Sequence, residues 1–297
     1  MSDKLVVGPD QMPGWLEKRR KIMGELEGQL IRGLRKPEKG FTLEQLQMVV
    51  EHRNPFEVVE TPADALVSRN TKLLSKKFGQ RIEVDPLPPE FTEENLAGWE
   101  KFNLKPIFLP DEEIGENRKL KGWVKPERWF YEKIGEGKIR SDSAQLHRGW
   151  YLADFTVGVD YTDGTQVFPN DPLAPIIYKL REEKKAGKYD NTPLGSRFSI
   201  THDEWREVVC PAIAQELGFR PNQIRLERAI EFNAIGNLYD ANRGKFNMWE
   251  WFDNIFEDFY RLGGGHRRHG GLAVVSCFLS SSRLGRIAGR PLVSFVK

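Results

Sequence analysis

The chain has 297 residues and is 39% hydrophobic, enough to fill one large core or two ordinary ones. Its 45 basic and 43 acidic residues leave a formal charge of +2, which argues against both a general polyanion binder and a disordered acidic chain. Two cysteines, Cys210 and Cys277, are too few for a disulfide framework.

The N-terminal stretch MSDKLVVGPDQMPGW lacks the apolar segment of a signal peptide, and no run approaches the eighteen apolar residues of a membrane span. We therefore expect a soluble, cytoplasmic protein with no membrane span. Export or surface display by a route that reads no N-terminal signal stays open.

The first part of the chain, residues 1–145, predicts a mixed, partly helical domain of unknown role. Apolar residues at helical spacing after Pro13 predict an amphipathic helix; they are Trp15, Ile22, Leu26, Leu30 and Leu34. A second short helix starts at Thr42 as N-cap and ends before Pro55. Residues 85–145 are rich in Pro, Trp and charge, which predicts short strands and turns and a domain junction within 135–148.

The remaining residues, 146–297, predict an α+β domain. YLADFTVGVDYTDGTQVF alternates as a strand does, and PLAPIIYKLREEKKAGK predicts a helix. A further helix begins at Thr201, with Glu204 completing a capping box, and ends at Gly218, while Pro211 should kink it or shift its start. RLERAIEFNAIGN predicts another short helix, and LAVVSCFL and RPLVSFV predict two final strands.

Several patterns raise catalytic or metal-binding alternatives, and each has a simpler structural interpretation. Asp154, Asp160 and Asp163 could pair for acid/base work, but Asp is also what turns and strand ends prefer. The histidines of HRRH at 266–269 have no carboxylate or Cys nearby in sequence, so we predict no metal and no cofactor. Gly263–Gly265 lacks the rest of a P-loop, which favours a turn or backbone crowding. Cys210 fits a buried thiol in a helix, and Trp249-Glu250-Trp251 fits core packing.

The end of the chain has a distinct composition. All 43 acidic residues and all 8 tryptophans precede Phe259, whereas seven basic residues follow it. The last segment is therefore a basic end on a mildly acidic body.

The order of motifs in the second part resembles a known family. RLERAIEFNAIGN, MWEWF, YRLGGG, GGLA and AGRPLVSF follow one another as the corresponding motifs do in the C-type-lectin-like domain of formylglycine-generating-enzyme-type proteins. The variable proteins of diversity-generating retroelements share that fold and carry their variable region at the C-terminal end. The resemblance spans about residues 148–297. It implies a C-type-lectin-like fold in the C-terminal half, with a variable ligand-binding region at about 261–290.

Two departures separate the relatives. Cys277 has no partner cysteine at short spacing, and five scattered histidines do not supply the iron cluster of the ergothioneine-pathway members, so we do not expect an enzyme. In the retroelement systems asparagine codons become NNY codons, which cannot encode Lys, Glu, Gln, Met or Trp. Every residue from Phe259 to Val296 lies within the permitted set. The resemblance therefore implies a surface diversified to bind varied macromolecular targets.

The expected binding surface combines the HRRH turn with the following strand and loop. In that strand Val275, Cys277 and Leu279 are expected to face outward. The predicted ligand-binding residues are His266, Arg267, Arg268, His269, Val275, Cys277, Phe278, Leu279, Ser281, Ser282, Arg283 and Arg286. The expected partner is a macromolecule, in the first place a protein, because Arg anchors around an apolar centre are typical of binding hot spots. A formylglycine-generating-type oxidoreductase and a basic nucleic-acid binder remain as alternatives.

Overall fold

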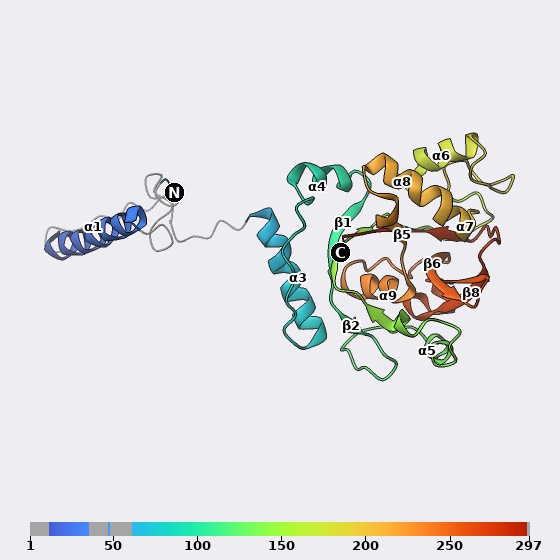
Figure 1. Cartoon of the computed structure of the whole chain (residues 1–297), viewed down its shortest axis with the longest axis horizontal. Coiled ribbons are helices and arrows are strands. Elements are labelled where there is room, and N and C mark those ends of the chain that lie inside the picture. The colour runs from blue at the N-terminus through green and yellow to red at the C-terminus, as the bar shows by residue number, and fades with distance from the viewer. Residues whose placement is uncertain (1–11, 36–46, 48–60, 296–297) are drawn as a thin grey trace. The chain divides into compact units, whose positions relative to one another are not determined.

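The computed structural model describes residues 12–35, 47 and 61–295 of the chain. The chain divides into two compact units, Met1–Thr61 and Pro62–Lys297. In the first unit the predicted amphipathic helix is confirmed as α1, Met12–Arg35 (Figure 1), and Ile22 on it is 59% exposed. Apart from residue 47, the helix predicted after Thr42 lies outside the described residues.

The second unit combines helices with antiparallel and mixed sheets, which confirms the predicted α+β class (Figure 1). Its α-helices are α3 (Pro62–Phe78), α4 (Glu93–Glu100), α5 (Arg128–Gly135), α6 (Ala174–Glu182), α7 (His202–Glu204), α8 (Cys210–Leu217) and α9 (Ala229–Leu238). Its strands are β1 (Leu104–Leu109), β2 (Glu112–Glu113), β3 (Gln145–Leu146), β4 (Gly149–Asp154), β5 (Ile224–Leu226), β6 (Trp249–Phe256), β7 (Tyr260–Gly264), β8 (Val275–Leu279), β9 (Ile287–Gly289) and β10 (Pro291–Ser294). None of the helices in the described residues combines the length and apolar character that crossing a membrane would need.

Two four-stranded sheets form the framework of this unit. The first has the order β1-β4-β10-β5 with antiparallel neighbours throughout, and the second has the order β8-β7-β6-β9. In the second sheet β9 runs parallel to β6, while β8 is an edge strand antiparallel to β7. The short strands β2 and β3 pair separately. The two predicted C-terminal strands thus correspond to β8 and β10, which belong to different sheets, whereas β9 was not predicted.

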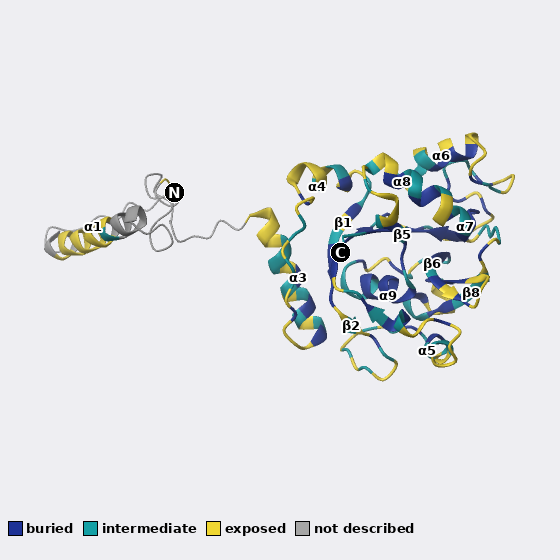
Figure 2. Ribbon diagram, viewed as in Figure 1, coloured by how far each residue is buried: buried dark blue, intermediate teal, exposed yellow. Residues whose placement is uncertain are grey.

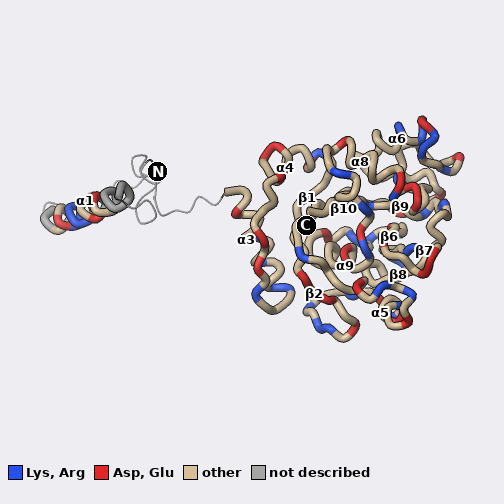
Figure 3. The backbone as a smooth tube through the Cα atoms, in the orientation of Figure 1, with Lys and Arg blue, Asp and Glu red and all other residues tan. Residues whose placement is uncertain are grey.

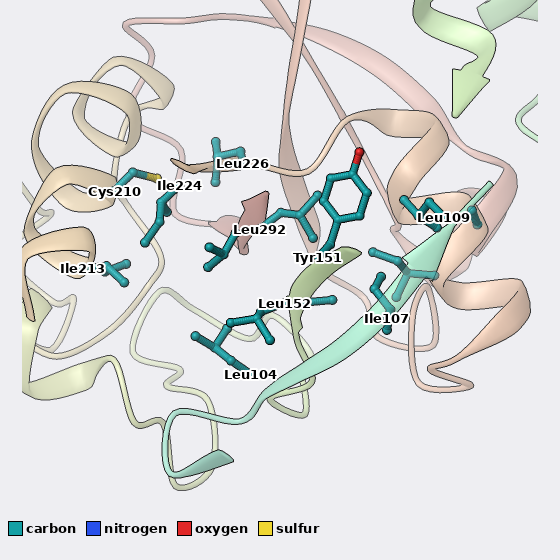
Figure 4. Packing of buried hydrophobic residues seen from close by; sticks show 14 of the residues in the cluster. Leu104, Ile107, Leu109, Tyr151, Leu152, Cys210, Ile213, Ile224, Leu226 and Leu292 are labelled. Carbon is teal, nitrogen blue, oxygen red and sulfur yellow. The ribbon is translucent and has the colours of Figure 1, made fainter. Parts of the chain in front are cut away.

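The main core lies against the first sheet. Its strands are mostly buried, whereas α3 and α4 expose much of their surface (Figure 2). Side chains of all four strands meet Cys210 and Ile213 of α8 in one cluster (Figure 4). β4 is a central strand and every residue in it is buried, so its side chains do not alternate between core and solvent as the sequence predicted. Residues 155–168 form no strand.

The predicted domain boundary between residues 145 and 146 lies inside this unit and is wrong. β1, from the segment before the boundary, pairs with β4 over its full length, from Leu104 opposite Asp154 to Leu109 opposite Gly149. The division falls instead between Thr61 and Pro62. Segment composition could not reveal this because the pairing joins residues about 40–50 positions apart in sequence.

The helix predicted from Thr201 to Gly218 is present but interrupted. The Thr201 hydroxyl accepts a hydrogen bond from the Glu204 amide at 3.1 Å, and the Glu204 carboxylate accepts one from the Thr201 amide at 2.9 Å, so the capping box is confirmed. A π-helical turn over Trp205–Val209 follows, and α8 then starts with Pro211 in its first turn. A proline there needs no amide donor, which explains the shifted start. Gly218 ends the helix at φ +71°.

The glycines at 263–265 confirm backbone crowding and a turn rather than a phosphate loop. A Cβ atom on Gly264 would lie 2.4 Å from the Val274 carbonyl oxygen, and Gly265 has φ +88°, which side chains rarely tolerate. These glycines let β7 approach its neighbours closely and turn into the HRRH segment.

Candidate functional site

The predicted binding residues fall into three exposure classes. The exposed ones are Arg267, Arg268, His269, Leu279, Ser281 and Arg286. The half-buried ones are His266, Cys277, Phe278, Ser282 and Arg283. Val275 is buried, with 4% of its surface accessible. The prediction that these residues form one outward surface is therefore correct only for part of the set.

The histidines of the HRRH turn lie against an aromatic base. The rings of His266 and His269 are 4.6 Å apart and lie 5.4 and 5.6 Å from the ring of Trp249. Phe278 of β8 contacts the same tryptophan at 5.2 Å, edge to face. Trp249 thus packs in the core, as predicted, and its ring also supports the histidines of the HRRH turn.

The nearby cations make this a basic surface. Burial lowers the pKa of His266, and the nearby His269, Arg286 and Arg268 lower it further, so these three side chains lie close to its ring. The buried Nδ1 atom of His266 has no hydrogen-bond partner in the described residues. We call residues 266–269 with Phe278 and Arg286 the C-terminal basic surface. Elsewhere in the second unit acidic and basic residues are interspersed (Figure 3).

The predicted orientation of β8 is wrong. Val275 and Cys277 pack into a second core cluster with Phe130 of α5 and Leu262 of β7, so they do not face solvent. Phe278 is on the opposite face and packs against Trp249 and Trp251. Both faces of this edge strand are therefore covered, and only Leu279 at its end, 40% accessible, is exposed.

Arg283 is a structural residue rather than a free anchor. Its guanidinium forms a bidentate ion pair with Glu204, at 2.7 and 2.8 Å, and donates to the Ser199 carbonyl at 2.6 Å. Glu204 is the same carboxylate that completes the capping box, so this pair fixes the loop before β9 to the start of α7. This partner could not be predicted from the local sequence, because Glu204 lies 79 positions earlier.

The aspartates and cysteines considered for catalysis lie in structural positions. Asp154 ends β4 and forms an ion pair with Arg197; Asp160 and Asp163 accept backbone hydrogen bonds from Asn247 and Thr165 at 2.7 and 3.0 Å. Cys210 is buried, and burial raises its pKa far above the usual value. Burial also raises the pKa of Cys277, the opposite of what a reactive thiol needs. No group of three or more metal-binding side chains occurs among the described residues.

A pocket of about 340 Å³ in the second unit is lined by none of the twelve predicted residues. The lining residues come from several segments of the chain, of which the first is the 3-10 turn at Ser141–Ala144 with the preceding Arg140 and the last is β7. Its most frequent lining residue is arginine: Arg140, Arg206, Arg225, Arg228 and Arg261.

Four of these arginines have carboxylate partners, and one does not. The pairs are Arg140 with Asp142 at 2.6 Å, Arg206 with Glu207 at 2.6 Å, and Arg225 and Arg228 with the shared Glu231 at 2.7 and 3.0 Å. Arg261 is 8% accessible, and its Nη1 donates only to the backbone carbonyls of Tyr260 at 2.9 Å and Asp258 at 3.4 Å. Within the described part of the chain it forms no ion pair, and its other guanidinium nitrogens make no hydrogen bond.

Two more polar groups in the pocket have unused hydrogen-bonding capacity. His202 is 1% accessible, and neither ring nitrogen has a hydrogen-bond partner among the described residues. Burial, with the charges of Arg261 and Arg206, lowers the pKa of His202 to about 3 although the Phe252 backbone favours the charged ring, so the imidazole is neutral. An Asp203 carboxylate oxygen lies 4.0 Å from Nδ1, beyond hydrogen-bond distance. The half-buried Asp253 carboxylate accepts no hydrogen bond in the described residues. Burial raises its pKa despite the nearby charge of Arg225.

Sequence reasoning missed this pocket. The one local signal was a charged residue, Arg261, within the otherwise uncharged strand sequence YRLGG. His202 gave no signal, because its position in a capping sequence explains it fully. Comparison of the chain with protein-family models, curated proteins and solved structures found no match.

Proposed function

We propose that the protein is a recognition protein whose C-terminal basic surface binds a macromolecular target, an acidic protein in the first place. The observation that carries this is the state of Arg267, Arg268 and Arg286. All three are exposed, and none forms an ion pair with the described residues. Arg268 and Arg286 lie near the ring of His266, which packs against Trp249 as Phe278 does. Arginines beside aromatic side chains held by the core are typical of binding hot spots.

The proposal includes diversification of this surface by a retroelement. A diversified surface needs a framework whose geometry does not depend on the varied side chains. Here the turn geometry rests on backbone conformation at Gly265, Gly270 and Gly271, all with positive φ, and on buried strands beneath. Exposed positions can then vary, whereas Val275 and Arg283 have to stay constant.

The test of diversification is sequencing of the gene and its downstream region from many cells of one culture. Diversification requires a near-copy of codons 259–297 and differences confined to codons of exposed residues such as 267, 268 and 286. Differences spread equally over the codons of Val275, Arg283 and other buried residues would contradict the proposal, as would the absence of any copy.

The test of binding is affinity capture with a charge-matched control. One variant replaces Arg267, Arg268 and Arg286 by Met, and the control replaces the exposed Lys72, Lys119 and Lys121 by Met. A partner retained by the wild type and the control but lost by the first variant supports the basic surface as the binding site. Equal loss in both variants indicates nonspecific charge attraction, and capture of nucleic acid favours the alternative of a nucleic-acid binder.

A further inference from the structure

We propose that the arginine-lined pocket binds a phosphate group, with Arg261 as its principal cation. This site is separate from the C-terminal basic surface and goes beyond the proposed recognition function. Three groups that line this pocket lack an ion pair or a side-chain hydrogen-bond partner in the described part of the chain: the Arg261 guanidinium, the His202 imidazole and the Asp253 carboxylate.

Arg261 is the first of the three groups, and it lacks a counter-ion in the described residues. A buried cation without a counter-ion is unfavourable, because it loses its hydration and gains no compensating ion pair. Arg261 is more than nine-tenths buried, and its guanidinium lines an open cavity rather than a packed core. Guanidinium groups bind oxyanions through paired N–H donors, so an oxyanion in the pocket would supply the missing partner.

His202 is the second group, and its two ring nitrogens lack hydrogen-bond partners in the described residues. Its ring is almost fully buried, edge-on to Trp251 with ring centres 5.8 Å apart, and lines the same cavity. A neutral imidazole carries one N–H donor and one acceptor nitrogen. Leaving both unsatisfied in a buried position is rare, which points to a ligand atom within reach of the ring.

Asp253 selects among oxyanions. Arg261, Arg225 and Arg228 all influence its carboxylate, which places it among the pocket's cations, yet none of them forms an ion pair with it in the described residues. A carboxylate in an anion site repels sulfate, which has no proton at neutral pH. Hydrogenphosphate, in contrast, can donate its own hydroxyl to that carboxylate. The cavity of about 340 Å³ is larger than one phosphate ion, so a small phosphate compound also fits it.

The experiment is calorimetric titration of the full chain with inorganic phosphate and, at matched ionic strength, with sodium sulfate. The variants are Arg261→Met in the pocket and Arg286→Met on the C-terminal basic surface as its matched control. We expect saturable phosphate binding that is at least about tenfold weaker in Arg261→Met and unchanged in Arg286→Met. Sulfate should bind at least about tenfold more weakly than phosphate, and Asp253→Asn should reduce that difference.

Histidine ring signals in NMR spectra locate the ion independently. Phosphate should shift the ring signals of His202 but not those of exposed His269, and an unchanged pattern of amide signals shows that each variant is folded. The proposal is overturned if phosphate does not saturate the protein at millimolar concentrations, if both Met variants weaken binding equally, or if sulfate binds as tightly as phosphate. None of these results depends on the macromolecular target, so failure here and failure of the recognition function are distinguishable.

Discussion

Two groups of buried arginines in the second unit differ in how their charges are compensated. Around the end of β4, Arg197, Arg243 and Arg290 contact residues 154–156, and each is bound to at least one buried carboxylate. In the pocket, Arg261 is comparably buried, but its hydrogen-bond partners among the described residues are backbone carbonyls alone. Arg181 is also buried and has no ion pair in the described residues, but all three of its guanidinium nitrogens donate to backbone carbonyls. Arg261 differs because only its Nη1 makes hydrogen bonds there.

The paired group forms a continuous network. Arg197 contacts Asp154 and makes two hydrogen bonds of 2.7 Å to Asp171, while Arg243 donates to the Asp154 carbonyl at 2.6 Å. Arg243 also binds Glu227 at 2.6 Å. Burial raises the pKa of Asp154, but the charges of Arg197 and Arg290 outweigh that effect and lower it to about 2. The end of β4 is thereby tied to segments far along the chain.

The largest expected effect comes from breaking this network. Arg197→Met leaves Asp154 and Asp171 buried without their cation, and removing one partner of a buried ion pair costs about 3–5 kcal/mol. Urea unfolding followed by tryptophan fluorescence measures the change, because seven of the eight tryptophans lie in the second unit.

The matched control is the same substitution in the pocket. Arg261→Met removes a buried cation that has no carboxylate partner in the described residues, so the free energy of unfolding should change by less than about 1 kcal/mol in either direction. A loss as large as that of Arg197→Met would mean that Arg261 is a structural residue and would remove the contrast between the two groups.

The second expected effect is a dependence of stability on pH caused by His202. Its pKa is about 3 in the folded protein against an ordinary 6.5, so between these values the unfolded chain binds a proton that the folded protein excludes. Stability should therefore fall as the pH drops below about 6.5, by up to about 1.4 kcal/mol per pH unit.

His202→Gln removes this contribution. Urea unfolding in phosphate-free buffers between about pH 6.5 and 4 should give a shallower slope for the variant than for the wild type. Equal slopes would show that His202 becomes charged as easily in the folded protein as in the unfolded chain, and would contradict its neutral, buried state.

The smallest expected effect separates two arginines that the sequence assigned to the same surface. Arg283→Met breaks a half-buried bidentate ion pair with Glu204 and should cost about 1–2 kcal/mol. Arg286→Met removes an exposed cation that has no ion pair in the described residues, and should change stability by less than about 0.5 kcal/mol. Thermal unfolding of both variants measures the difference, and equal values would place Arg286 in a structural contact.

The candidate surface could be predicted only in part because exposure depends on the neighbours of a strand. The alternation along β8 correctly separated Val275 and Cys277 from Phe278. It could not show which face is covered, and both are, one by the core beneath α5 and the other by Trp249 and Trp251. In the turn, by contrast, Arg267, Arg268 and His269 are exposed as expected, because a short polar turn between glycines has few means of burial.

Local chemistry in the sequence determined the helix start at Thr201 and the stop at Gly218, since the cap of Thr201 with Glu204 involves residues only three positions apart. It also determined the α+β class and the basic character of the C-terminal end. Only the tertiary structure decided the sheet order, the true division at Thr61, the pairing of Arg283 and the existence of the pocket. Each of these depends on which distant groups meet, as when His202 and Arg261 come to line one cavity from segments 59 positions apart.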